Sequence, residues 1–191
     1  MRYLIKQLWP LVLLLVVSIG AVIWAPTDAW YYQPLREFFL FACYVMIVGS
    51  LLGFAGRFVP RRFRWDKAPF APCKWEREGR IYRDRLHIER WKDKLTDMSK
   101  ATDKVASKAV GGATDSASLM ASIQEMCVAE ATHGVIILLS PLMFLLLRRW
   151  YGVALWAAYV AANLLDIIIM RYNRPRVVRL YRRATEREAR Q

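Results

Sequence analysis

Two pairs of polar residues in the C-terminal half have the residue types and spacing for proton-transfer chemistry. Glu130 and His133 are three residues apart, and so are Asn163 and Asp166. Residues three or four apart share one face of an α-helix, so each pair can present both side chains to one neighbour. A histidine beside a carboxylate is the usual general-base pair, because the acid orients the imidazole and stabilises its protonated form.

An arginine-rich segment, RYNRPR at residues 171–176, follows the second pair closely. Planar guanidinium groups bind phosphate oxygens two at a time, which suits Arg174 and Arg176 to a lipid headgroup or an acyl donor. Asn163 or Arg171 could stabilise the oxyanion of an acyl-transfer intermediate. This stretch of the chain could therefore serve acyl transfer next to a phosphate-binding group.

Other interpretations of the same residues remain open. The arginines also fit the positively charged flank of a membrane helix. Asp166 could be a structural partner of an arginine, and His133 a helix cap. Glu130-x-x-His133 is half of a di-iron motif, but that site needs two such motifs and two further glutamates, so no metal is expected. Cys127 could be a thiol nucleophile beside the histidine, although nothing else marks it.

The elements that must position these residues are membrane helices. The chain has 191 residues, of which 56% are hydrophobic, and its apolar blocks alternate with basic ones. Spanning a bilayer takes about 20 apolar residues, and the candidate segments are residues 8–25, 38–56, 135–147 and 151–170. The third is short and spans only if residues 127–134 join its helix. A re-entrant hairpin of the last two segments is the alternative to four full spans.

Lysine and arginine are distributed unevenly around these segments. Of 29 such residues, sixteen lie within residues 57–108 and eight within residues 171–190, and two precede the first apolar segment. Positive charge favours the cytoplasmic side, so both termini and the central loop are predicted to be cytoplasmic. The formal net charge of +13 flanks apolar spans instead of forming a basic domain. No nucleic acid is therefore expected as a partner.

The sequence predicts an all-α integral membrane protein with about four transmembrane or re-entrant helices in two hairpins. Its expected regions are an N-terminal hairpin (1–57), a cytoplasmic insert (58–126), a second membrane hairpin (127–170) and a basic tail helix (171–191). The two antiparallel helices of the second hairpin would bring the histidine, both carboxylates and the arginines to one depth in the membrane.

Local signals refine these boundaries. An apolar stripe with helical spacing predicts an amphipathic helix from Ile88 to Met98, lying on the bilayer or against the other helices. Residues 99–118 are small and polar and are expected to be the most mobile part. Ser140-Pro141 predicts a kink in the third segment, and Pro175 predicts that the last helix breaks near Asn173.

Three blocks of the chain resemble the glycosyl-4,4′-diaponeurosporenoate acyltransferases of the staphyloxanthin carotenoid pathway. The blocks are EREGRIYRDRLHIERWKDKL (76–95), EMCVAEATH (125–133), and Asn163 followed by RYNRPR (171–176). The resemblance covers about residues 63–188. It implies transfer of a fatty acyl group to a hydroxyl of a glycolipid or another polar lipid. The reaction would take place at the cytoplasmic leaflet of a bacterial inner or plasma membrane.

Residues and resemblance together assign expected roles. His133 is the expected general base, oriented by Glu130 or Asp166, and Asn163 and Arg171 are the expected oxyanion donors. The groups expected to hold donor or lipid phosphate are Lys92, Arg171, Arg174 and Arg176. The residues expected to support them are Trp91, Glu125 and Asn173.

Expected partners are membrane lipids and an acyl donor. The donor, acyl-CoA or another activated acyl group, is a substrate, so no cofactor is expected. A homo-oligomer is left open. The alternative function is a non-enzymatic lipid-binding or assembly subunit of a membrane complex, in which polar residues stabilise helix packing. A transporter is less favoured, because no inverted repeat is evident.

Overall fold

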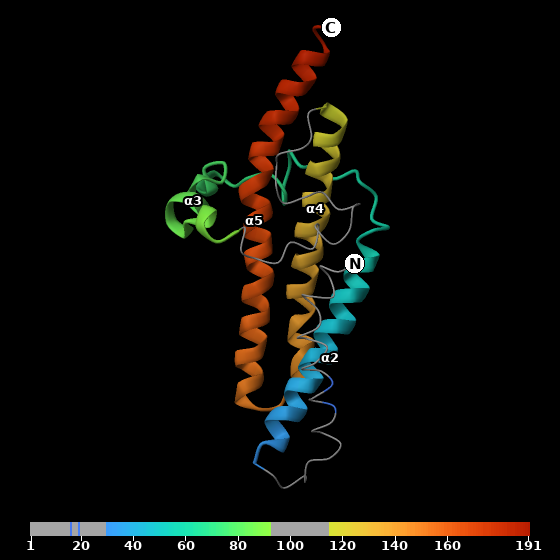
Figure 1. Ribbon diagram of the computed structural model, residues 1–191, viewed down its shortest axis with the longest axis vertical. Coiled ribbons are helices and arrows are strands. Elements are labelled where there is room, and N and C mark those ends of the chain that lie inside the picture. The colour runs from blue at the N-terminus through green and yellow to red at the C-terminus, as the bar shows by residue number, and fades with distance from the viewer. Residues whose placement is uncertain (1–15, 17–18, 20–29, 93–114) are drawn as a thin grey trace. The chain divides into compact units, whose positions relative to one another are not determined.

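The computed structural model describes residues 30–92 and 115–191, together with Val16 and Ile19. Every regular element in this part of the chain is helical, which confirms the predicted all-α class (Figure 1). The α-helices are α2 (Tyr32–Ala55), α3 (Arg80–Leu86), α4 (Ser116–Leu139) and α5 (Trp150–Glu188). Short 3₁₀ turns connect them: η1 (Lys74–Glu76), η2 (Ile88–Arg90) and η5 (Ser140–Leu145).

Three described segments are long and apolar enough to cross a membrane: α2, α4 continued by η5, and α5. They contain the predicted apolar segment 151–170, and all but the last one or two residues of the segments 38–56 and 135–147. The short third segment reaches spanning length as expected, because α4 begins at Ser116 and includes residues 127–134. The segment at residues 8–25 lies outside the described residues apart from Val16 and Ile19. The chain is therefore a membrane protein.

The described residues form two compact units. The first comprises the chain up to Arg57 with Gly134–Asn163, and the second comprises Phe58–His133 with Leu164–Gln191. Both α4 and α5 contribute residues to each unit. Every polar group in an apolar medium needs an internal partner. In the first unit, the buried Glu37 of α2 accepts hydrogen bonds from the backbone N–H groups of Arg148 and Arg149, just before α5 begins.

The predicted kink at Ser140-Pro141 is present as the change from α4 to the 3₁₀ turn η5. Ser140 is fully buried, and its hydroxyl donates to the carbonyl of Ile137 at 2.7 Å. The same hydroxyl accepts a 2.8 Å hydrogen bond from the indole N–H of Trp156 in α5. The kink is thus held by side chains from both arms of the second hairpin.

The prediction that the last helix breaks near Asn173 is wrong. Helix α5 continues to Glu188 with Pro175 inside it. A proline removes one backbone hydrogen bond and crowds the preceding turn, at a cost of about 3 kcal/mol. Burial of Val177 and Val178 beyond the proline, and ion pairs of Arg171 and Arg174 before it, offset that cost. Tertiary packing here overrides a local signal.

The insert differs from its prediction where it is described. The apolar stripe that begins at Ile88 forms a 3₁₀ turn and not an α-helix up to Arg90. The reason lies at His87, whose left-handed backbone (φ 46°) ends α3 and separates it from the turn. Residues 93–114 lie outside the described residues, and with them the rest of the stripe and most of the segment expected to be mobile.

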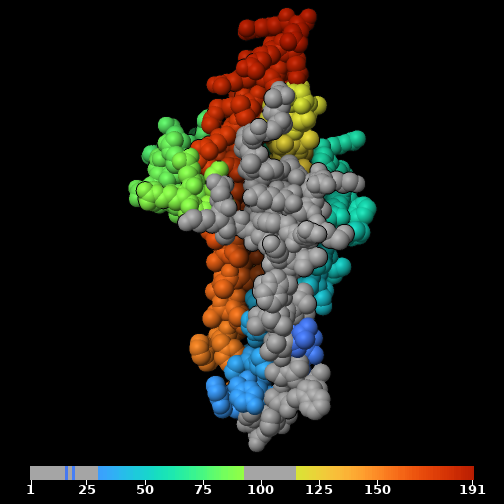
Figure 2. Space-filling view, viewed as in Figure 1, coloured from blue at the N-terminus to red at the C-terminus, as the bar shows by residue number. Residues whose placement is uncertain are grey.

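Two buried apolar clusters hold the second unit together. One joins α4 to the C-terminal part of α5 through Leu119, Ile123, Met126, Val177, Val178 and Ala184. The other joins the insert to α5 through Tyr82, Ile88, Ile169 and Tyr172. In the space-filling view the segment around α3, in green, lies beside the red part of α5 (Figure 2). The described part of the insert thus packs against α5.

Candidate active site

A histidine and a carboxylate from two different helices meet in the second unit. Nε2 of His133, on α4, lies 3.8 Å from Oδ2 of Asp166, on α5. The two side chains are 26% and 30% exposed, so both are reachable from outside the protein. An imidazole beside a carboxylate can accept a proton from a substrate hydroxyl, because the carboxylate stabilises the imidazolium that forms.

Glu130, one helical turn before His133, binds two arginines of α5. Its Oε1 accepts a 2.8 Å hydrogen bond from Nε of Arg171, and its Oε2 accepts one from Arg174. Arg174 is 3% exposed, and its guanidinium also lies over the Phe70 ring at 5.7 Å and 3.4 Å from Sγ of Cys127. A charge buried this deeply must be paired, so these contacts fix α5 against α4 at this level.

Arg171 extends the network into the insert. It donates to Oε1 of Glu76 at 2.6 Å and to the carbonyl of Pro69 at 2.6 Å. Glu76 is 1% exposed, and it also accepts hydrogen bonds from the hydroxyl of Tyr82 and, at 2.5 Å, from the backbone N–H of Cys73. Two carboxylates and two guanidinium groups thus form a neutral buried network that joins α4, α5 and the insert.

Burial and hydrogen bonding act on the Glu76 carboxyl in opposite directions. Burial raises its pKa, but hydrogen bonds from Tyr82, Arg171 and the Cys73 amide outweigh burial and hold the pKa below its ordinary value. The partner hydroxyl responds in the opposite sense. Burial and then the hydrogen bond to the Glu76 carboxylate raise the pKa of Tyr82. The carboxylate is therefore ionised and the phenol neutral near pH 7.

A second group of predicted site residues surrounds Tyr172. The guanidinium of Arg176 stacks on its ring at 4.1 Å, and Nζ of Lys92 lies 5.7 Å from the ring centroid. The Tyr172 hydroxyl donates to Oε1 of Glu89 at 2.5 Å, and Arg176 pairs with the same oxygen at 3.0 Å. These hydrogen bonds lower the pKa of the Glu89 carboxyl. Two of the four expected phosphate ligands therefore lie at this tyrosine.

The remaining predicted site residues have other contacts. Asn163 is buried in the first unit, where its Nδ2 donates to the Tyr159 carbonyl at 2.8 Å. Glu125 pairs with Arg61 at 2.8 Å, and the Trp91 indole donates to the Leu86 carbonyl. Asn173 is 1% exposed, and among the described residues nothing hydrogen-bonds its Oδ1.

Sequence reasoning missed Glu76, Tyr82 and Glu89 as members of these groups. All three lie in the block 76–95, which carries part of the family resemblance. Only Trp91 and Lys92 of this block were predicted to belong to the site. A usable signal was present, because arginines next to an apolar helix need carboxylates and this block supplies several.

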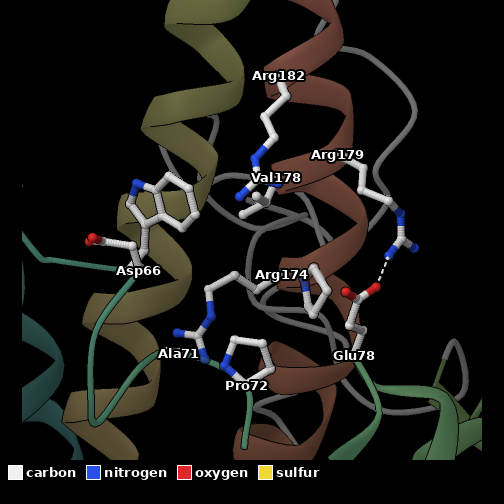
Figure 3. A pocket seen from close by; sticks show the side chains of 10 residues that line it. Asp66, Ala71, Pro72, Glu78, Arg174, Val178, Arg179 and Arg182 are labelled. Carbon is white, nitrogen blue, oxygen red and sulfur yellow. Dashed lines mark hydrogen bonds and ion pairs between the residues drawn. The ribbon is translucent and has the colours of Figure 1, made fainter. Parts of the chain in front are cut away.

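A cavity of about 200 Å³ opens beside the network (Figure 3). Arg174, Arg179 and Arg182 of α5 line it together with Trp65 and two carboxylates, those of Asp66 and Glu78. Arg179 reaches Glu78 at 3.1 Å, as the dashed line shows. In this cavity Arg174 is committed to Glu130 and Arg179 pairs with Glu78, whereas the carboxylate of Asp66 pairs with Arg64 at 3.6 Å.

The fold and these contacts define a class of protein. It is an α-helical membrane protein with a histidine–carboxylate pair one helical turn from an arginine–glutamate network. Comparison with known families is more specific. The chain belongs to the glycosyl-4,4′-diaponeurosporenoate acyltransferase family, whose sequence profile matches residues 66–183. The family name identifies an acyltransferase, and the match includes both histidine–carboxylate partners and the whole network. No curated protein and no solved structure matches the chain.

Proposed function

We propose that this chain transfers a fatty acyl group to a hydroxyl of a glycolipid or another polar lipid at the cytoplasmic leaflet, with His133 as the general base. The observation that carries the proposal is the 3.8 Å approach of His133 to Asp166, from two helices inside the matched region. The apolar helices around it offer a medium in which acyl chains and a lipid acceptor are soluble.

The proposed reaction is a direct acyl transfer. The imidazole of His133 takes the proton from the acceptor hydroxyl while its oxygen attacks the carbonyl carbon of the donor. A tetrahedral oxyanion forms and collapses, the bond from carbon to the leaving group breaks, and the imidazolium returns its proton to that group. Asp166 holds the imidazole and stabilises its charged state. Proton transfer by such a general base contributes about 10²- to 10⁴-fold to the rate.

The arginine–glutamate network has a positioning role in this proposal. Glu130 binds Arg171 and Arg174 one turn from the histidine, and so it sets the register of α4 against α5 where His133 meets Asp166. The expected roles of Asn163 and Arg171 as oxyanion donors stay predictions. So does the expectation that Lys92 and Arg176 hold phosphate.

The test compares the two histidines of the chain. His133→Asn and His87→Asn make the same chemical change, and His87 lies exposed at the end of α3. Each purified variant is placed in lipid nanodiscs with a fatty acyl-CoA, an acyl carrier protein thioester or a phospholipid as donor, and with a glycolipid acceptor. We expect His133→Asn to lower kcat about 10²-fold or more and His87→Asn to leave it unchanged.

Asp166→Asn supplies the second variant. It keeps the shape of the side chain and removes its charge, so we expect a lower kcat with an intact thermal unfolding transition. Unchanged turnover in His133→Asn would remove the assigned base. Intact cellular function combined with a large loss of stability in Asp166→Asn would instead favour an assembly subunit.

A further inference from the structure

Four arginine side chains from two distant parts of the sequence line one cavity in the second unit. Arg80 and Arg83 belong to α3, and Arg176 and Arg179 belong to α5. The cavity has a volume of about 320 Å³, which is within the range of small-molecule sites. Among the described residues that line it, the carboxylate of Glu78 is the one acidic group.

Close packing fixes the two walls of this cavity. Gly79, directly before α3, has a left-handed backbone (φ 85°) and lies against α5. A Cβ atom at Gly79 would be 3.2 Å from the backbone oxygen of Tyr172. On the other wall, the guanidinium of Arg176 stacks on the Tyr172 ring, and Tyr172 itself is 2% exposed. Arg176 is therefore held in position before any ligand arrives, which lowers the entropic cost of binding.

The carboxylates near the cavity neutralise its arginines only in part. Three of the arginines each pair with a carboxylate that is at least half exposed, in the pairs Arg83–Asp84, Arg176–Glu89 and Arg179–Glu78. Exposed pairs of this kind contribute about 0–1 kcal/mol, and each guanidinium has five donors, so most donors remain available to a ligand. Within residues 30–92 and 115–191, no carboxylate pairs with Arg80.

This arrangement differs from an ordinary basic flank of a membrane helix. The arginines of a flank are free to spread apart, because like charges repel. Here packing brings four of them to one cavity from positions about a hundred residues apart in the chain. The neighbouring cavity in Figure 3 is lined by three arginines and two carboxylates, against four arginines and one carboxylate here. An anion with several oxygens is the ligand that offsets such repulsion.

We infer that this cavity binds the phosphate of the acyl donor, with Arg80, Arg83 and Arg179 as ligands beside Arg176. The inference rests on the proposed function, because an acyltransferase needs an activated donor. Acyl-CoA, acyl carrier protein thioesters and phospholipids all carry phosphate, so the shared chemistry is a phosphate ester. The donor is thereby held by α3 and α5, outside the buried network.

The experiment measures binding in dodecyl maltoside, a detergent without phosphate. Coenzyme A and dihexanoylphosphatidylglycerol are titrated separately into the full-length protein by calorimetry. The double variant Arg80→Gln/Arg83→Gln removes two charges from the cavity. The matched control, Arg77→Gln/Arg85→Gln, removes two exposed charges from the same segment that do not line it.

We expect at least one probe to bind, with a Kd raised about tenfold or more in Arg80→Gln/Arg83→Gln and less than about threefold in the control. Tighter binding of coenzyme A assigns the site to thioester donors, and tighter binding of the phosphatidylglycerol assigns it to phospholipid donors. Absence of binding by both probes, or equal weakening in both double variants, would overturn the inference.

The His133→Asn variant separates this inference from the proposed function. It should bind the probe with the wild-type Kd while losing transfer. Full transfer in His133→Asn together with weak binding in Arg80→Gln/Arg83→Gln would refute the assigned base and leave the phosphate site standing.

Discussion

Two nearly buried carboxylates pair with arginines of α5: Glu76 with Arg171, and Glu130 with Arg171 and the buried Arg174. Removing one partner of such a pair leaves the other charge buried without compensation, which typically costs about 3–5 kcal/mol. The two acids differ in surroundings, because Glu76 also accepts from Tyr82 and from the Cys73 amide. Glu76 therefore links the fold of the insert directly to the residues that flank His133.

Glu76→Gln should lower the free energy of unfolding in detergent by about 3 kcal/mol or more at pH 7. Its effect should also depend on pH in a defined direction. The folded pKa of Glu76 lies below the ordinary value of 4.5, so its stabilisation is complete above pH 4.5 and is lost as pH falls further. Unfolding curves between pH 7 and pH 3 should show the wild type and Glu76→Gln converging at the acid end.

Glu78→Gln is the control for this measurement, because Glu78 forms an exposed pair with Arg179. We expect a change of about 1 kcal/mol or less. A constant difference between wild type and Glu76→Gln across the whole pH range would contradict the assigned hydrogen bonding of the carboxylate.

Single residues differ in how far the sequence alone could place them. The approach of His133 to Asp166 was predictable, because each is a polar residue on an apolar helix and a short loop connects the two helices. The role of Glu76 was not, because it depends on how the insert folds back onto α5. The partners of Glu130 were only half predicted: the arginines were expected nearby, but as phosphate ligands and oxyanion donors.

The helices predicted best are those whose existence follows from the length of an apolar segment alone. The spans within α2, α4 and α5 follow from segments of hydrophobic residues. The helix break expected near Asn173 is absent. The residues that pack against α5 on either side of Pro175 lie on other elements, and a single sequence does not show which residues those are. The predicted amphipathic helix from Ile88 was wrong for a related reason. A pattern of apolar residues does not reveal the left-handed backbone at His87, which ends α3 and precedes a 3₁₀ turn.

The contact between the insert and α5 depends on the absence of a side chain at Gly79. In Gly79→Ala the new methyl group meets backbone atoms of Tyr172 at 3.2 and 3.3 Å in an unfavourable left-handed conformation. We expect the free energy of unfolding to fall by about 1–3 kcal/mol. Thermal unfolding in detergent measures the change.

Gly134→Ala is the matched control for that substitution. Gly134 lies inside α4, and a Cβ there meets no atom within 4 Å. Alanine is favoured over glycine in a helix by about 0.5–1 kcal/mol, so this variant should be as stable as the wild type or more so. Equal destabilisation by the two substitutions would show that Gly79 is not a close contact.

The orientation of the whole chain in the membrane is a prediction from its charge. Cysteines introduced at Trp150 and Gln191, in a background without Cys43, Cys73 and Cys127, can be labelled from either side with an impermeant maleimide. Trp150 is 80% exposed, at the start of α5. We expect Gln191→Cys to react from the cytoplasmic side and Trp150→Cys from the opposite side. Labelling of Trp150→Cys from the cytoplasm alone would indicate a re-entrant hairpin.

The family match identifies an acyltransferase, and the proposed acceptor is a membrane lipid. Mass spectrometry of lipids from bacteria fed ¹³C-labelled fatty acid tests this directly, in cells that carry the wild-type gene, His133→Asn or no gene. We expect a lipid species whose mass has increased by one labelled acyl group in the wild type, and its absence in the other two. The same lipids in all three strains would contradict the proposed activity.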